Sequence, residues 1–186
     1  MQMRFDMLIK HWYESGKEEI ENAKKEQPYD LKNCCYFDAF INLWISFNAI
    51  YSSFSCNGGR SERDQIEQFL MKSAVGELVC RKQYEFVKTH SALKYFQNNT
   101  VKNMNPSFSH TNDTEEYRKK LNIRGQSTKP LLQNLLYCIY LVRCNLFHGQ
   151  KTPLDIVDSR IIKESALFMY DFLTVYITNT QKEQSN

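Results

Sequence analysis

The sequence lacks a long hydrophobic run. No apolar segment approaches the roughly 20 residues that a membrane-spanning helix requires, and residues 1–10 do not contain the apolar stretch of a secretory signal peptide. Both absences argue against insertion into a membrane or passage across it. We therefore expect a cytoplasmic protein with no membrane partner.

A marked excess of charge of either sign is also missing. The chain has 24 lysines and arginines against 21 aspartates and glutamates, so its net charge is only +3. This excess of positive charge is too small to identify a nucleic-acid binder. The near balance of the two signs also does not suggest an acidic protein that mimics a partner. Any function that involves nucleic acid must therefore be argued from particular residues.

Cysteines paired at metal-ligand spacing are absent as well. Several of the six cysteines fall inside apolar helical runs, where a thiol packs as a small hydrophobic side chain. We interpret them as reduced core thiols, and the sequence has no acidic cluster typical of a metal site. No metal and no other cofactor is expected. The six are Cys34, Cys35, Cys56, Cys80, Cys138 and Cys144.

The sequence does contain enough apolar material for a packed core. Hydrophobic residues make up 42% of the chain, aromatic residues 13% and charged residues 24%, as in globular domains. The 186 residues fit a single domain spanning 1–186. Alternation of apolar and polar residues is nowhere long enough for a sheet. These features predict an all-α, largely up-and-down bundle of about five main helices plus short extra helices.

Apolar residues at helical spacing divide the first third of the chain into three predicted helices. An amphipathic helix is predicted within 1–28, because one face of it collects Phe5, Leu8, Ile9 and Trp12. Residues 30–54 are apolar around so much of the circumference that this helix belongs in the middle of the bundle. After a break at 55–59, Ser61 followed by Asp64 is typical of a helix N-cap with an acidic first turn.

The middle of the chain contains shorter helical patterns and one long polar segment. Helical spacing is visible at 66–70 and 78–87. The asparagine-rich stretch 97–113 has no periodicity and is predicted to be a flexible loop, either mobile or facing a substrate. A short charged helix at 115–124 is expected to end at Gly125.

A second central helix follows and carries the most informative residues. Pro130 marks its first turn, and His148 followed by Gly149 marks its end, with the glycine in the left-handed conformation. A last helix is predicted over 155–177, before a disordered tail at 179–186. The apolar face of the second central helix consists of Leu131, Leu135, Ile139, Val142 and Leu146.

Arg143 and His148 near the end of this helix are the candidate catalytic residues. A permanently charged guanidinium beside a core usually faces an anion. The alternative is that Arg143 is a surface residue or half of an ion pair, and that His148 only interacts with the helix dipole. An arginine and a histidine can together cleave RNA without a metal. The imidazole transfers protons near neutral pH, which contributes roughly 10²–10⁴-fold, while the guanidinium binds phosphate oxygens.

The joint pattern resembles the HEPN family, in particular its prokaryotic ribonucleases and toxins. One part of the resemblance is Arg143-x4-His148-Gly149 within the string Val142-Arg143-Cys144-Asn145-Leu146-Phe147-His148-Gly149-Gln150-Lys151. The other part is Phe40-x3-Trp44-x2-Phe47-Asn48-Ala49-x-Tyr51 on the early core helix. The resemblance covers residues 30–178 in architecture, while its specific motifs cover only these two short segments.

The resemblance implies a homodimer whose composite cleft holds two copies of Arg143 and His148. This fits the spacing, because two residues five positions apart on a helix lie well off a common face and roughly 7.5 Å apart along the axis. Family members often have a polar residue directly after the arginine, where this chain has Cys144. Asn145 is the candidate for that polar role.

Two further residues are candidates for binding the substrate. Asn48 on the early core helix has an amide that needs partners, either within the fold, which is the favoured interpretation, or on the catalytic helix or the RNA. Lys151 follows the catalytic helix and is placed to hold an RNA phosphate, although loop lysines are usually just solvated. A basic helix could also follow the RNA backbone, although a solvated face is the default, and it consists of Tyr117, Arg118, Lys119, Lys120 and Arg124.

These residues lead to one main hypothesis and two alternatives. The main hypothesis is a metal-independent endoribonuclease that leaves a 2′,3′-cyclic phosphate and acts as a toxin or an antiviral defence effector. The resemblance implies control in trans by a partner such as an antitoxin or a nucleotidyltransferase. The alternatives are a non-catalytic HEPN adaptor that dimerises or binds RNA, and a helical structural protein with a coincidental match.

Overall fold

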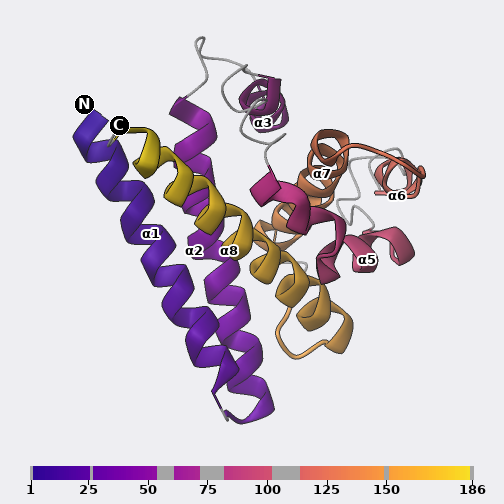
Figure 1. Cartoon of the computed structure of the whole chain (residues 1–186). Helices are drawn as coiled ribbons and strands as arrows, with labels where there is room; N and C mark the ends of the chain where they lie inside the picture. The colour runs from indigo at the N-terminus through magenta and orange to yellow at the C-terminus, as the bar shows by residue number, and fades with distance from the viewer. Residues whose placement is uncertain are drawn as a thin grey trace.

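Three long helices, α1, α2 and α8, form the frame against which the shorter helices pack (Figure 1). The computed structural model describes residues 2–25, 27–53, 61–71, 82–101, 114–148 and 151–184. Within these ranges every regular element is a helix, which confirms the all-α prediction. The elements are α1 (Gln2–Lys24), α2 (Tyr29–Ser53), α3 (Glu62–Met71), the 3₁₀ helix η1 (Lys82–Lys88), α5 (Ser91–Asn98), α6 (Glu115–Leu121), α7 (Thr128–Phe147) and α8 (Ile156–Gln184).

The first two helices run side by side as a long antiparallel pair (Figure 1). The predicted amphipathic helix is present as α1, but its predicted apolar face is only partly buried, since Leu8 is 44% exposed. The buried face instead contains Tyr13, Ile20 and Ala23, which lie where α2 and α8 cover α1. Sequence spacing identifies an apolar stripe but does not show which part of it a neighbouring helix covers.

Helix α2 lies at the centre of the bundle, as predicted. Its aromatic and aliphatic side chains are almost completely inaccessible to solvent on more than one side of the helix. Phe47 shows how far this contact extends, because its ring lies 5.6 Å from the ring of Phe69 on α3 and 5.6 Å from the ring of Phe172 on α8. Both pairs have the edge-to-face geometry that aromatic rings favour.

Helix α3 begins with the cap that the sequence predicts. The backbone N–H of Asp64 donates to Oγ of Ser61, and the backbone N–H of Ser61 donates to Oδ2 of Asp64, each at 3.2 Å. This reciprocal pair satisfies two backbone donors at the start of the helix. Glu62 is therefore held as the first residue of a well-defined helix.

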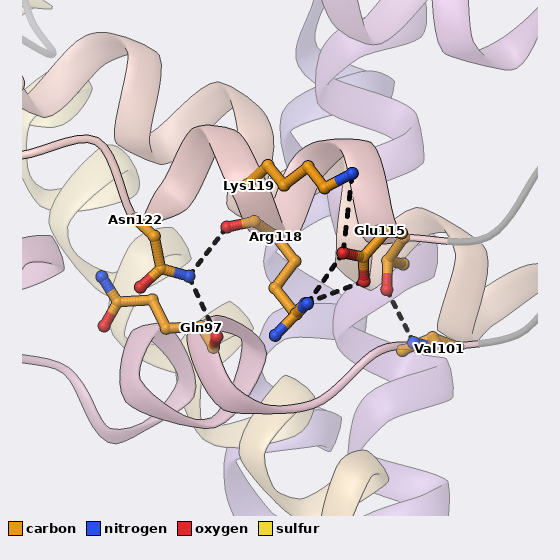
Figure 2. A network of polar contacts seen from close by, with 7 residues as sticks. Gln97, Val101, Glu115, Arg118, Lys119 and Asn122 are labelled. Atoms are coloured by element: carbon orange, nitrogen blue, oxygen red, sulfur yellow. Dashed lines mark hydrogen bonds and ion pairs between the residues drawn. The ribbon is translucent and has the colours of Figure 1, made fainter.

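The ends of α5 and α6 are joined by amide side chains (Figure 2). The Gln97 side chain donates to the carbonyl oxygen of Leu121 at 2.9 Å, and the Asn122 side chain donates to the carbonyl oxygen of Gln97 at 3.0 Å. Helix α6 ends at Leu121, before the predicted 124, and Gly125 in the following turn has φ of +73°, which favours glycine.

Val101 and Thr114 pair across the polar segment that the sequence predicts to be a loop. The Val101 N–H donates to Oγ1 of Thr114 at 2.6 Å, and the Thr114 N–H donates to the Val101 carbonyl oxygen at 3.1 Å. The predicted boundary at 97 is wrong, because α5 continues through Asn98. Residues 102–113, on which most of the loop prediction falls, lie outside the described residues.

The last two helices include one confirmed prediction and one correction. Helix α7 is a second central helix, with most of its predicted apolar face buried. Helix α8 continues to Gln184, so the predicted disordered tail is wrong over residues 179–184. The physical reason is visible at Asn179, which is 9% exposed and so receives tertiary support that its polar sequence neighbourhood does not indicate. No helix in the described ranges combines the length and the apolarity needed to cross a membrane.

The close approach of α1 to α2 depends on Gly16. A Cβ atom at this position would lie 2.6 Å from Cγ of Leu43 and 3.2 Å from the carbonyl oxygen of Ala39, both on α2. Leu43 is fully buried, so it has little room to move away. Overpacking of a core costs about 1–3 kcal/mol, and alanine recovers at most about 1 kcal/mol through its helix propensity.

We expect Gly16→Ala to lower the free energy of unfolding by about 1–2 kcal/mol, measured by urea denaturation. Glu18→Ala, at an exposed position of the same helix, is the matched control and should change stability little. Equal or greater stability of Gly16→Ala would contradict the close contact described for Leu43.

Candidate functional site

The two predicted catalytic residues lie at the C-terminal end of α7. Arg143 is in the last full turn, and His148 caps the helix through its backbone N–H, which donates to the carbonyl oxygen of Cys144 at 3.1 Å. The His148 side chain is exposed. Gly149, predicted to take the left-handed conformation, lies outside the described residues.

The guanidinium of Arg143 is held on two sides. Its Nη1 lies 3.1 Å from Oε2 of Glu62 on α3, and its Cζ lies 4.5 Å from the centre of the Phe147 ring. The Arg143 side chain is only 24% exposed and that of Glu62 only 20%. Nε of Arg143 is buried and has no hydrogen-bond partner among the described residues. The interpretation of Arg143 as half of an ion pair is therefore confirmed, and one buried donor is left over.

Glu62 also binds two residues of α2. Its Oε1 accepts a hydrogen bond from the Tyr51 hydroxyl and another from Nε1 of Trp44 at 3.2 Å. We refer to Trp44, Tyr51, Glu62 and Arg143 as the Glu62 cluster. The cluster joins α2, α3 and α7, and it includes two of the aromatic residues on which the family resemblance rests.

Two tyrosines at the cluster are kept in their neutral form. Burial raises the pKa of Tyr51, and the hydrogen bond to Glu62 raises it further because the hydroxyl must stay protonated to donate. Burial likewise raises the pKa of Tyr140, with a smaller contribution from neighbouring Cys144. The Tyr140 ring lies 6.3 Å from the Trp44 ring, so Tyr140 packs next to the Glu62 cluster.

The structure does not bring Arg143 and His148 together within one chain. The described residues contain no hydrogen bond or ring contact between them, as their separation along the helix predicts. The described residues also contain no group of three histidine, cysteine, aspartate or glutamate side chains able to hold a metal ion. One chain alone presents a partly buried guanidinium that is paired with a carboxylate, and an exposed imidazole.

The three predicted substrate-binding residues are engaged elsewhere. Asn145 is 1% exposed and lies inside the bundle, so it does not share a surface with His148. Lys151 forms an ion pair with Asp158 at the start of α8, and its side chain is 10% exposed. Asn48 accepts a hydrogen bond from Ser52 at 2.9 Å within α2. The contact of Asn48 lies within the fold, in line with the favoured interpretation for this residue, and whether any of the three binds a substrate stays a prediction.

The basic helix α6 pairs most of its cations internally. Arg118 binds Glu115 through two nitrogens, at 2.9 and 2.7 Å, and Lys119 lies 3.9 Å from the same carboxylate (Figure 2). Lys120 lies 2.6 Å from Glu116. This pattern is that of a solvated helix stabilised by pairs three and four residues apart.

Glu62 is the important residue that the sequence analysis missed. The acidic first turn of α3 is visible in the sequence, but that pattern also fits a simple helix-dipole interaction. Nothing in the spacing indicates that Glu62 contacts Arg143, because the two residues are far apart in the chain. Their contact depends on how α3 packs against α2 and α7.

Comparisons with protein-family models, with curated proteins and with solved structures find no match to this chain. The HEPN resemblance therefore rests on the motif residues of the sequence.

The raised tyrosine pKa values predict that stability falls at alkaline pH. An unfolded tyrosine loses its proton near pH 10, whereas Tyr51 and Tyr140 hold theirs to higher pH in the folded protein. Stability is therefore fully present below about pH 10 and falls as pH rises further, by about 1.4 kcal/mol per pH unit for each such group. Urea denaturation at several pH values measures this slope, and absorbance at 295 nm reports the ionisation. Tyr51→Phe should reduce the slope, whereas Tyr29→Phe, at a side chain that is 58% exposed, should leave it unchanged.

Proposed function

We propose that this chain is a metal-independent endoribonuclease of the HEPN type, with Arg143 and His148 as its catalytic residues. Cleavage proceeds by attack of the RNA 2′-oxygen on the adjacent phosphorus. A P–O bond forms to the 2′-oxygen while the bond to the 5′-oxygen breaks, and a 2′,3′-cyclic phosphate is left. One imidazole accepts the proton of the 2′-hydroxyl, and a second imidazole protonates the departing 5′-oxygen.

The observation that carries the proposal is the buried, unpartnered Nε of Arg143. A charged donor that is buried without an acceptor costs free energy, and such an atom in a native protein needs an explanation. A phosphate oxygen is the acceptor that a guanidinium binds best. Placed there, the cation would stabilise the negative charge that develops on the phosphorus oxygens during cleavage.

A second copy of the chain is needed to complete the site. Five residues at about 100° each put Arg143 and His148 about 140° apart around α7. Two α7 helices that face each other across a twofold axis would bring both arginines and both histidines to one cleft. This arrangement also supplies the two imidazoles that the reaction uses.

Exposed hydrophobic side chains lie shortly before and after His148 in the sequence, and they favour such a pairing. Phe147 is 52% exposed, and after the turn Leu154, Ile156 and Val157 are 77%, 72% and 67% exposed. Exposed apolar side chains on a monomer often mark a protein contact when they form a patch. We refer to Leu154, Ile156 and Val157 as the α8 apolar patch, and we propose that it lies at the dimer contact.

In the cell, the activity would be that of a toxin or an antiviral defence effector under control in trans. This part of the proposal follows from the family resemblance. A protein partner, such as an antitoxin or a nucleotidyltransferase, would restrain the ribonuclease, because uncontrolled RNA cleavage stops growth.

The alternative function is a non-catalytic dimerising or RNA-binding adaptor. The ion pair between Arg143 and Glu62 favours it, because a carboxylate 3.1 Å from the guanidinium reduces the positive field available to a phosphate. The two functions differ in what they predict for RNA, since an adaptor would bind the RNA without cutting it.

We expect Arg143→Ala and His148→Ala to reduce RNA cleavage by about 10²–10³-fold and about 10²–10⁴-fold, respectively. The assay follows purified protein acting on RNA in the presence of a chelator, together with growth and total RNA of bacteria that express each variant. Arg143→Lys preserves a cation opposite Glu62 but loses the planar fork, so it should also be strongly impaired.

Lys10→Ala and His11→Ala are the matched controls, because both positions are exposed on α1 and away from the end of α7. Both should cleave like the wild type. Binding of RNA by the wild type without any cleavage would favour the adaptor, and equal cleavage by the wild type and both alanine variants would refute the assigned site.

We expect Ile156→Lys to convert a dimer to a monomer and to abolish cleavage, because it places a charge within the α8 apolar patch. Sedimentation equilibrium measures the oligomeric state. Met7→Lys makes the same change at a residue of α1 that is 67% exposed, and it should leave the dimer intact. A wild type that is monomeric at the concentration where it cleaves RNA would contradict the composite cleft.

A further inference from the structure

We propose that Glu62 is a positioning residue, which orients the guanidinium of Arg143 so that its Nε–Nη2 edge receives the RNA phosphate. This inference depends on the proposed function, and it assigns a role in the reaction to a residue outside both sequence motifs. Three contacts within the Glu62 cluster and one with Phe147 support it.

The orientation of the Glu62 carboxylate is determined by α2. Trp44 Nε1 can only donate a hydrogen bond, and it lies 3.2 Å from Oε1 of Glu62, which also accepts from the Tyr51 hydroxyl. With Oε1 occupied in this way, Oε2 is directed to α7. There it lies 3.1 Å from Nη1 of Arg143.

The orientation of the guanidinium follows from this contact. Nη1 lies 3.1 Å from Oε2 of Glu62, and Cζ lies over the Phe147 ring, 4.5 Å from its centre. These two contacts restrict where the guanidinium can lie. The edge formed by Nε and Nη2 is the one not bound to Glu62, and its Nε is buried without a partner among the described residues.

This remaining edge has the geometry that binds two phosphate oxygens. Nε and one terminal nitrogen of an arginine donate parallel hydrogen bonds to two oxygens of one anion. Nε is not accessible to solvent in the free chain, so a phosphate would reach it only after a neighbouring side chain such as Phe147 moves aside, and it would then give Nε the acceptor that it lacks. The carboxylate thus acts as the group that directs the fork, comparable to the third member of a catalytic triad, which orients its neighbour without reacting.

A carboxylate is required at position 62, because an amide cannot accept hydrogen bonds both from the donors on α2 and from the guanidinium of Arg143. Glutamine has one oxygen that accepts and one nitrogen that donates. If the oxygen faces Trp44 and Tyr51, the amide nitrogen faces Nη1 of Arg143, and two donors then oppose each other. Glu62→Gln therefore preserves the link between α3 and α2 while it releases Arg143, and this makes it the informative variant.

The experiment measures steady-state cleavage of an RNA by the wild type, Glu62→Gln, Arg143→Ala and the double variant. Misplacement of a catalytic group by about 1 Å costs on the order of 10²-fold, so we expect kcat of Glu62→Gln to fall by about 10²-fold with KM changed by only a few-fold. Because Glu62 acts through Arg143, the double variant should be no slower than Arg143→Ala alone.

Two controls separate positioning from folding. Glu67→Gln removes the same charge from the same helix, away from Arg143, and should retain wild-type kcat. The indole N–H resonance of Trp44, identified in a Trp12→Phe background, should stay dispersed in Glu62→Gln if its bond to position 62 persists. A variant with wild-type thermal stability and this resonance in place, but with reduced kcat, supports positioning.

The outcomes distinguish this inference from the proposed function. If Arg143→Ala and His148→Ala lose cleavage while Glu62→Gln cleaves as well as the wild type or faster, the function stands and the positioning role is refuted. Additive losses in the double variant also refute it, since Glu62 would then act independently of Arg143. If Arg143→Ala cleaves like the wild type, the assigned site is wrong and the positioning role fails with it.

Discussion

The burial of α2 is the constraint on which the rest of the structure depends. This helix is apolar around most of its circumference, and its side chains Phe40, Leu43, Phe47 and Ile50 are at most 1% exposed. A helix of this kind must be covered on all sides, because each large apolar side chain left in water would lose the protein about 1.5–3 kcal/mol of stabilisation from burial. The positions of α1, α3 and α8 around α2 follow from this requirement (Figure 1).

The same burial explains why the candidate site contains a carboxylate. Trp44 and Tyr51 bring an indole N–H and a hydroxyl into the interior of the bundle, where each needs an acceptor. Glu62 provides that acceptor from α3 and, in turn, needs a cation, which Arg143 supplies from α7. The charged residues are therefore part of how the core is completed. The proposed function therefore uses side chains on which the stability of the bundle also depends.

Much of the fold is predictable from the sequence, and less of the site is. The periodic spacing of apolar residues and the residues that cap a helix are local features of the sequence. The central helices and the Ser61–Asp64 cap can therefore be predicted from neighbouring residues. The end of α8 is not local, because its last turns depend on neighbours that cover Asn179. The position of Arg143 and His148 at the end of α7 was predicted, whereas the partner of Arg143 and the burial of Asn145 depend on tertiary packing. Lys151 shows the same limit, because its ion pair with Asp158 forms only when α8 packs behind the turn.

The pairing of Val101 with Thr114 has a consequence for how this protein can vary. Two hydrogen bonds hold Val101 and Thr114, the residues on either side of 102–113, next to each other. The free-energy cost of closing a loop rises only slowly with its length. Relatives of this protein could therefore lengthen or shorten the segment without moving α5 or α6. A reporter domain inserted there would be attached to the bundle through a junction that the fold already closes.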